Sequence, residues 1–501
     1  MKLKYPISVI LLFFFIGIDA NTISYSKNFE YLSIKALCVS KPLKNISIIN
    51  ILDKGAKASP GFDNTSIIQY CLDNYSIVYI PAGIYEYSNI LIRKTGVKLY
   101  GDGKGKTILQ TTRVADTPQH SQPNIRILRS NCSIENLTST YKNLPNFKQN
   151  AIGRNAINED ANISIGWSEV YTHSKSFLVE NVTVQNCEVI GSIVQGIAIG
   201  VSNNVRILKN IIKQTRGTGI FGYYSNGISV IDNDISNTGD DGIYIAANGD
   251  TKYSPYGRNS NVLITKNKIS NSSAKGIGIS GCENAEISFN IINSTFADGI
   301  LVSKDHAGGH VSPKNVKIHD NTLCNIFGEF GSNYKHIVSA VDELKGFFAM
   351  IGIITDELDS ADNAYEVYNN TAVADSRLIN KYGYYGTYVF GYNVKIYNNK
   401  YSNGYFGIMI GNPSSSSFNE TSGITLQKNE FKDFSRNVVM INSSDISIID
   451  NFFGEAEWCI TEETVNNVSI VNNFFNTESR FFLNQTGSKV LKINNKFNII
   501  N

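Results

Sequence analysis

The sequence predicts an all-β solenoid in which short parallel strands stack coil upon coil. Three observations lead to this fold class. A short apolar strand that ends on the same position, nearly always Asn, recurs eleven times. The intervals between these positions are mostly 22 or 23 residues, with longer steps where residues are inserted. The strands are rich in β-branched residues and alternate with a period of two, which disfavours a helical-repeat solenoid. Repeats of this length cannot bury an apolar face alone, so they must stack on their neighbours.

The recurring position, called the repeat position below, is assigned to structure and given no catalytic role. Asn tolerates a left-handed turn conformation, and its amide can hydrogen-bond to the next Asn along a stack. The single Cys in the set is expected to be a small buried core residue. The repeat position falls on Cys187, Asn210, Asn233, Asn267, Asn290, Asn321, Asn399, Asn429, Asn451, Asn473 and Asn495.

A second strand in each coil begins with Gly followed by Ile, nine residues after the repeat position in five successive coils. Coils of about 22–24 residues with at least two strands follow from this spacing. The longer steps place loops at Asn248–Ser260 and Lys304–Lys314, and a larger insertion at about 327–392 that is expected to pack as a subdomain. Loops at the same edge of neighbouring coils are expected to wall off a groove.

The N-terminus has the features of a secretory signal. Lys2 and Lys4 precede an apolar run from Ile7 to Ile18, and a small residue, Ala20, follows. We therefore expect residues 1–20 to be a signal peptide and the protein to be secreted or extracytoplasmic, in the periplasm or at the cell surface. The run is too short to span a bilayer comfortably, so we expect no membrane span in the mature chain. An uncleaved anchor is the alternative.

The remaining chain is expected to hold one large domain. Residues 21–49 form an N-terminal segment of unknown structure, and residues 50–501 a single solenoid domain with a cap region at 50–110. The charge is nearly balanced, with 45 basic and 43 acidic residues, which predicts no nucleic-acid partner. The seven Cys form no close-spaced framework, and no Cys/His cluster suggests zinc, so no cofactor is expected.

The cap region carries a family resemblance. Asp63 is expected to cap a short amphipathic helix over Asn64–Leu72 that closes one end of the barrel. The segments Asp53–Lys57, Asp63–Gln69, Val78–Tyr85 and Val97–Gly103 resemble the N-terminal signature of the pectate-lyase-like superfamily. The resemblance implies a right-handed parallel β-helix. The superfamily includes polygalacturonases, lyases, epimerases and phage tailspikes, and the tailspike-like members leave a trimer open for this chain.

Stacking the coils in register brings polar residues together. The position just before the repeated Gly is occupied in turn by Gln195, Thr218, Asp241, Lys275 and Asp298. Neighbouring rungs lie about 4.8 Å apart, so Asp241 and Asp298 should be about 10 Å apart with Lys275 between them. Inverting glycosidases hold their two carboxyls about 6.5–9.5 Å apart, a range that flexible side chains can reach.

One of these rungs also carries a resemblance. The stretch Asn237–Ile245 resembles the Gly-Asp-Asp motif of polygalacturonase-type glycoside hydrolases. The resemblance implies that Asp240 is the general acid and that Asp241 helps to activate water. The family's Asp one coil earlier is replaced by Thr218 and its cleft His one coil later by Lys275. Its Arg-x-Lys pair falls on Leu301 and Ser303, neither of which is basic.

These departures suggest a different distribution of roles. Asp298 would supply the missing carboxylate beside Asp240 and Asp241. The remaining candidates would bind an anionic sugar, transfer protons or stack on sugar rings: Lys275, Arg216 and Lys304, then His306 and His310, then Tyr223 and Tyr244. The sequence thus predicts a secreted protein whose partner is a polysaccharide, with hydrolysis of an acidic polysaccharide by carboxylate acid/base catalysis as the first hypothesis.

Two alternatives remain open. In a polysaccharide lyase or uronate epimerase, Asp240, Asp241 and Asp298 would hold Ca²⁺ and Lys275 would act as base if its pKa were lowered. In a noncatalytic glycan-binding or surface-fibre protein, the same groove would only recognise sugar.

Overall fold

The computed structural model describes residues 47–113, 123–146, 160–166, 178–249, 257–304, 311–327, 348–355, 364–375, 384–411, 421–476, 482–484 and 490–498. Residues 46–501 form one compact unit. The expected signal peptide and nearly all of the segment 21–49 lie outside the described residues. No helix among the described ranges is long and apolar enough to cross a membrane.

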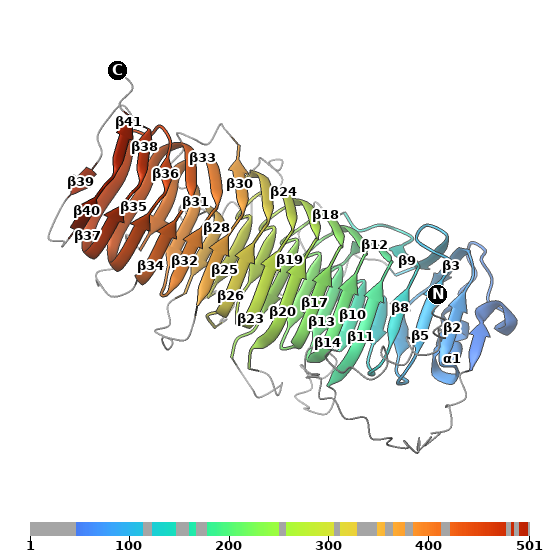
Figure 1. Cartoon of the computed structure of the whole chain (residues 1–501). Coiled ribbons are helices and arrows are strands. Elements are labelled where there is room, and N and C mark those ends of the chain that lie inside the picture. The colour runs from blue at the N-terminus through green and yellow to red at the C-terminus, as the bar shows by residue number, and fades with distance from the viewer. Residues whose placement is uncertain are drawn as a thin grey trace, which may run out of the picture. The chain divides into compact units, whose positions relative to one another are not determined.

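The fold is a right-handed parallel β-helix whose strands form three ladders, each strand pairing in parallel with its counterpart one coil away (Figure 1). The first ladder consists of β1 Ile48–Asn50, β2 Ile77–Ile80, β5 Lys98–Gly101, β8 Ser133–Glu135, β11 Val179–Gln185, β14 Ser202–Leu208, β17 Asn226–Ile231, β20 Asn259–Thr265, β23 Cys282–Ser288, β26 Lys314–His319, β29 Tyr365–Tyr368, β32 Val394–Tyr397, β34 Ser422–Gln427 and β40 Val490–Ile493.

The second ladder consists of β3 Gly83–Tyr87, β6 Thr107–Thr111, β9 Thr138–Tyr141, β12 Glu188–Ser192, β15 Ile211–Thr215, β18 Asp234–Thr238, β21 Lys268–Ser272, β24 Ile291–Thr295, β27 Thr322–Ile326, β30 Thr371–Ala374, β36 Phe452–Phe453, β38 Phe474–Asn476 and β41 Lys496–Asn498. The third, which carries the candidate site, consists of β4 Ile90–Ile92, β7 Ile125–Ile127, β10 Ile163–Gly166, β13 Ile197–Gly200, β16 Ile220–Tyr223, β19 Ile243–Ala246, β22 Ile277–Ile279, β25 Ile300–Ser303, β28 Phe348–Ile354, β31 Tyr384–Phe390 and β39 Phe482–Asn484. Three long strands pass from one ladder to the next: β33 Lys400–Ile410, β35 Glu430–Ile449 and β37 Trp458–Val471.

The N-terminal end of the barrel is covered as expected. A 3-10 helix, η2 (Ile51–Lys54), precedes the helix α1 (Thr65–Asn74), whose Ile68, Cys71 and Leu72 are buried. The N-cap residue is Asn64, not Asp63 as expected, and its side chain makes no cap hydrogen bond. The carboxylate of Asp63 still accepts a hydrogen bond from the Thr65 N–H at 2.9 Å, so it satisfies a donor at the start of α1. An amphipathic helix in this position shields the first rungs of the core from water.

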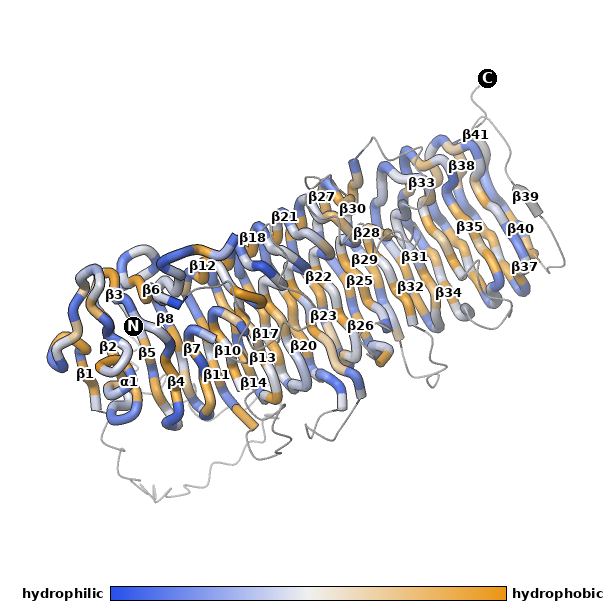
Figure 2. Tube along the Cα trace, turned by 180° about the vertical axis from the view of Figure 1, so that it is seen from behind, coloured by the Kyte–Doolittle hydropathy of each residue, from blue (hydrophilic) through white to orange (hydrophobic). Residues whose placement is uncertain are grey.

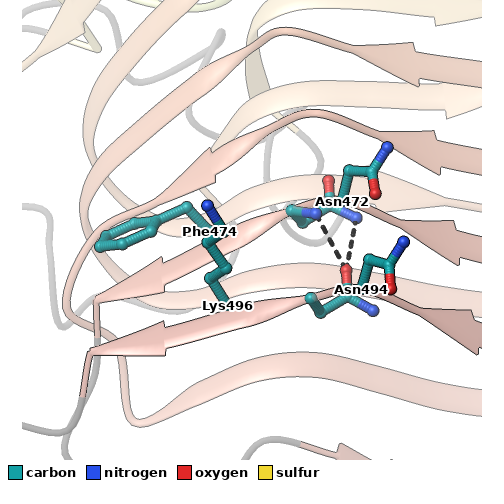
Figure 3. Close-up of a pocket in the computed structure, with 6 residues that line it drawn as sticks. Asn472, Phe474, Asn494 and Lys496 are labelled. Atoms are coloured by element: carbon teal, nitrogen blue, oxygen red, sulfur yellow. Dashed lines mark hydrogen bonds between the residues drawn. The ribbon is translucent and has the colours of Figure 1, made fainter.

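The repeat position forms a buried hydrogen-bonded ladder. The Asn267 carboxamide oxygen accepts both the backbone N–H and the side-chain N–H of Asn233, at 3.0 and 2.9 Å. Its own amide donates to the Val230 carbonyl and to Asn290. In the last such step, Asn473 donates its backbone N–H and its side-chain amide to the Asn495 carboxamide oxygen, at 2.9 and 3.1 Å. Figure 3 shows these last coils, with the neighbouring Asn472 and Asn494 labelled. The left-handed φ expected for this position lies instead one residue earlier, for example at Lys266.

The expectation that about 327–392 packs as a separate insertion is not what the structure shows. This segment contributes the regular strands β28, β29, β30 and most of β31, which pair in register with the coils on either side. Asn370 occupies the repeat position within it, bonded to Asn321 and Asn399. The signal was present, because Tyr365–Asn370 repeats the pattern of Val394–Asn399. The long step from Asn321 to Asn399 therefore covers two coils.

The core runs along the interior of the barrel. Inward positions of the third ladder are almost all aliphatic, as in Ile220, Ile243, Ile277 and Ile300, each fully buried. Figure 2 shows the alternation of apolar and polar residues along the strands. Cys187 is also fully buried with its thiol reduced, as expected of a core residue. Because this core fixes the register of every rung, it also fixes which side chains meet on the outside.

Candidate active site

The candidate site lies on the outward side of the third ladder, just before the strands β16, β19, β22 and β25. Backbone hydrogen bonds from each repeated Gly to the next rung align Thr218, Asp241, Lys275 and Asp298, as expected from the sequence. The repeated Gly is required because the barrel is tight there: a Cβ at Gly242 would lie 2.7 Å from the Gly276 carbonyl oxygen. Asp241 and Asp298 are two rungs apart, about 10 Å along the ladder.

Asp241 and Lys275 form an ion pair at the centre of this row. The Lys275 ammonium lies 3.1 Å from each carboxylate oxygen of Asp241, and the Lys275 backbone N–H donates to Oδ1 at 2.8 Å. The Asp241 side chain is only 2% exposed, against 24% for Lys275. Burial raises the pKa of Asp241 to about 7; Lys275 opposes this shift and Asp240 adds to it. Asp241 therefore changes protonation near neutral pH.

Lys275 is unsuited to the role of a base. Burial acts to lower the pKa of its ammonium, but the charges of Asp241 and Asp240 outweigh burial and raise it. The expectation of a lowered pKa, on which the elimination hypothesis relied, is contradicted. The same ammonium also lies 5.3 Å from the centre of the Tyr244 ring, a favourable cation–π distance.

Asp298 is the second buried carboxyl of the row, with 5% of its surface exposed. Its Oδ1 accepts the Ala349 backbone N–H at 2.7 Å. Burial raises the pKa of Asp298 to about 6, with the Ala349 hydrogen bond and Lys275 acting in the opposite direction. Asp241 and Asp298 are thus two desolvated carboxyls with raised pKa values, and carboxyls of this kind can take acid and base roles.

Asp240 is placed differently from its neighbour Asp241. It is exposed, and its carboxylate lies at the rim of hydrogen-bond distance, 3.5 Å, from the Thr218 hydroxyl. It thus points toward the rung where polygalacturonase-type proteins carry another Asp. The Gly239 before it leaves no room for a side chain, because a Cβ there would lie 2.3 Å from the Arg216 carbonyl oxygen. The three carboxyls consequently occupy three different points along the row.

Aromatic residues flank the row one step further along the strands. Tyr244 pairs in register with Phe221 on one side and Gly278 on the other, and its ring centre is 5.9 Å from that of Phe221. Gly278 makes room for this ring, since a Cβ there would lie 2.8 Å from the Tyr244 Cδ2 and 3.4 Å from the Asp241 Oδ2. Tyr223 stacks on Phe221 at 6.0 Å. Tyr244 thus adjoins the ion pair, whereas Tyr223 lies farther along the strands, in register with Ala246.

Other expected binding residues are less well placed. Arg216 is 3% exposed, so its side chain is largely withdrawn from solvent. Lys304 follows β25 and is partly exposed, with its backbone N–H bonded to the Ile354 carbonyl. His306 and His310 lie outside the described residues. Among the described residues, no three His, Cys, Asp or Glu are arranged to hold a metal ion, and this includes Asp240, Asp241 and Asp298.

A pocket in the described structure lies away from the row. Figure 3 shows it at the last coils, lined by Asn472, Asn473, Phe474, Asn494, Asn495 and Lys496. Asn473 and Asn495 in its wall belong to the structural Asn ladder. The pocket therefore adds nothing to the candidate site, and the groove expected over coils 216–310 stays a prediction.

Two features of the row were missed in the sequence. Gln195 accepts the Thr218 backbone N–H at 2.7 Å, and Asp241 and Asp298 do the same for the rungs after them. Every second residue of the row therefore satisfies a backbone donor. The alternation of Gln, Asp and Asp at these rungs was a visible signal. The second feature, the space that Gly278 leaves for the Tyr244 ring, could not be predicted from the sequence because it depends on how that ring is tilted.

The comparisons with known proteins agree with this architecture. Residues 48–245 match the family described as "Rhamnogalacturonase A/epimerase, pectate lyase-like". The match confirms the resemblance to pectate-lyase-like β-helix proteins over the cap and the first coils, up to the strand that follows Asp241. No curated protein sequence matches the chain.

The solved structures that the chain resembles include two alpha-1,3-glucanases and an exopolygalacturonase. The catalytic domain of a GH87 alpha-1,3-glucanase in complex with tetrasaccharides has a TM-score of 0.51 at 16% identity, covering 90% of this chain and 69% of its own. The catalytic unit of the alpha-1,3-glucanase from Streptomyces thermodiastaticus scores 0.48 at 17% identity, covering 80% of this chain and 65% of its own. A Family 28 exopolygalacturonase of Yersinia enterocolitica scores 0.43 at 15% identity, covering 90% and 78%.

Proposed function

We propose that this protein is a carbohydrate-active enzyme that hydrolyses a glycosidic bond of a polysaccharide. The observation that carries the proposal is the pair of buried carboxyls, Asp241 and Asp298, two rungs apart on one outward row and both with pKa values raised toward neutrality. The family match and the likeness in fold to a GH87 alpha-1,3-glucanase solved with tetrasaccharides support a glycan substrate.

In the proposed mechanism Asp241 is the general acid and Asp298 the general base. Burial raises the pKa of both carboxyls, and the charge of Asp240 raises that of Asp241 further, so Asp241 is assigned the proton and Asp298 the ionised form. Asp241 gives its proton to the glycosidic oxygen, and Asp298 takes one from the water that attacks the sugar. The Lys275 ammonium, already 3.1 Å from both Asp241 oxygens, stabilises the carboxylate left behind.

This assignment differs from the one that the Gly-Asp-Asp resemblance implies. Asp240 is exposed and bonded toward Thr218, whereas Asp241 is buried, so burial favours Asp241 for the acid. Asp240 then has an electrostatic role, because its negative charge raises the pKa of Asp241. The two-rung spacing of about 10 Å between Asp241 and Asp298 favours inversion at the anomeric carbon, since a water must fit between one carboxyl and the sugar.

Product analysis tests the proposal. The purified protein is incubated with a panel of neutral and acidic polysaccharides, and the products are separated by mass and ultraviolet absorbance. New reducing ends without unsaturated sugars are expected, and NMR of the first product should show the inverted anomer. An unsaturated product or altered uronate composition without cleavage would overturn hydrolysis in favour of elimination or epimerisation.

A noncatalytic glycan-binding protein is the second candidate. One observation favours it: Asp241 and Asp298 accept the backbone N–H of the next rung in the same manner as Gln195, which cannot act as an acid. Saturable oligosaccharide binding without any product after prolonged incubation would support this candidate.

We also propose that residues 1–20 direct export and that the mature protein works outside the cytoplasm. The charged start and short apolar run support this proposal. Expression in a secreting host followed by N-terminal sequencing should give a chain that begins near residue 21. A cytosolic chain that retains Met1 would contradict it.

A further inference from the structure

The charge balance of the candidate site bears on the kind of sugar that it accepts. The row presents three carboxyl groups, on Asp240, Asp241 and Asp298, against the one ammonium of Lys275. That ammonium is held by both oxygens of Asp241 and lies over the Tyr244 ring. Its positive charge is therefore already paired with the Asp241 carboxylate. Even with Asp241 protonated, two carboxylates remain against one cation.

The neighbouring cations do not change this balance among the described residues. Arg216 is 3% exposed, and both Arg216 and Lys304 have partners within the protein. A uronate that bound to either side chain would compete with an interaction that is already present. Desolvated carboxylates repel a further negative charge strongly, because the effective dielectric constant around buried groups is low.

The apolar side chain of Leu301 lies beside Asp298, because atoms of both lie within 4 Å of the Cβ position of Gly352. Leu301 pairs in register with Gly278 and leans along the ladder, with its Cδ1 2.8 Å from the Cβ position of Gly352. Ser303 follows two residues later on the same strand. Leu301 occupies the same register position on its strand as Phe221 and Tyr244 do on theirs, so this side of the site offers hydrocarbon and aromatic surface.

We propose that the site takes a neutral glycan and rejects polyuronates, with Leu301 and Ser303 as specificity-determining residues. Neutral pyranose rings present apolar C–H faces that can pack on Tyr244 and Leu301, and hydroxyls that can donate hydrogen bonds to carboxylates. This inference deepens the proposed function, and it replaces the expectation of an acidic polysaccharide. It concerns binding as well as turnover, so the two can be tested apart.

The test uses ligand pairs that differ only in charge. Polyuronate oligosaccharides and the same oligosaccharides after reduction of their carboxyls to alcohols are titrated calorimetrically, together with neutral glucans, at pH 8 and low salt. We expect a neutral ligand to bind at least tenfold more tightly than its uronate counterpart. The ratio should shrink as salt is added, because salt screens the repulsion of the uronate. Equal or tighter binding of the uronate, or no binding of any glycan, would overturn the inference.

A charge-introducing variant supplies the second arm. Leu301→Arg with Ser303→Lys should shift the preference toward the uronate by at least tenfold. The matched control places the same charges at two exposed apolar positions on the first ladder, Leu491→Arg with Ile493→Lys, and should leave the preference unchanged. An unchanged preference in the variant with Leu301→Arg and Ser303→Lys would also overturn the inference. Turnover is measured separately at pH 6.5: selective neutral binding without cleavage would sustain this inference and overturn the proposed hydrolysis.

Discussion

Replacing Lys275 by Met should expose how strongly the ion pair stabilises the buried carboxylate of Asp241. Met keeps most of the side-chain volume and removes the ammonium. At 3.1 Å the Coulomb attraction of the pair is about 5 kcal/mol for an effective dielectric constant near 20. Lys275 is 24% exposed, so solvent reduces this value. We expect the free energy of unfolding to fall by about 3 kcal/mol at pH 8.

The pH dependence of this loss distinguishes the mechanism from a packing defect. Because the folded-state pKa of Asp241 is raised to about 7, its carboxyl is protonated at pH 5. Removing the Lys275 ammonium at that pH therefore breaks no ion pair with Asp241. The variant should therefore be destabilised by about 1 kcal/mol or less at pH 5 and by much more at pH 8. Urea unfolding followed by circular dichroism at both pH values measures the difference.

A surface pair provides the control. Lys213 and Glu188 lie 2.8 Å apart, with 36% and 16% of their side chains exposed. Lys213→Met should cost about 1 kcal/mol or less at both pH values, as exposed pairs do. The reasoning about Lys275 would be refuted if its variant lost the same stability at pH 5 and pH 8, or no more than the Lys213 variant.

Three further predictions concern the ladder, the aromatic contact and the carboxyls. Asn267→Ala should lower the free energy of unfolding in urea by about 3 kcal/mol, because it leaves the buried Asn233 N–H without an acceptor. Asn495→Ala, at the partly exposed end of the Asn ladder, should lower it by about 1 kcal/mol. Equal losses of stability in the two variants would argue against the ladder. Gly278→Ala should lower kcat/KM about tenfold with little change in melting temperature, since its Cβ would displace the Tyr244 ring lying 2.8 Å away; unchanged kinetics would show that the ring position is irrelevant. Asp298→Asn should raise stability by about 1–3 kcal/mol at pH 8 and leave it unchanged at pH 4, because the raised folded-state pKa of about 6 means that stability is lost as pH rises through that value. Urea titrations at the two pH values measure this, and a variant less stable than the wild type at pH 8 would contradict it.

The repeat spacing sufficed to predict the fold and the row, because the register of the coils follows from the spacing of the repeats along the sequence. Once Gly219, Gly242, Gly276 and Gly299 are aligned, their preceding residues must stack. Asn370 was missed because 49 residues separate it from Asn321, although the pattern around it was present.

Side-chain direction could not be predicted in the same way. Asp240 and Asp241 are adjacent in sequence, yet one points toward Thr218 in solvent and the other is buried against Lys275. Whether Lys275 binds an anionic ligand or Asp241 depends on burial and rotamer, which the repeat pattern does not contain. The role of Gly278 depends likewise on the lean of the Tyr244 ring along the ladder.

The turnover number of carboxyl variants on the glycan that the wild type cleaves tests the central claim most directly. Asp241→Asn and Asp298→Asn should each lower kcat by at least about 10³-fold. The control Asp234→Asn, an exposed carboxyl on the second ladder, should keep wild-type activity. The wild-type kcat should be greatest between about pH 6 and about pH 7, where Asp298 is ionised and Asp241 protonated. Full activity in either Asp241→Asn or Asp298→Asn would contradict the assignment of hydrolysis to this row.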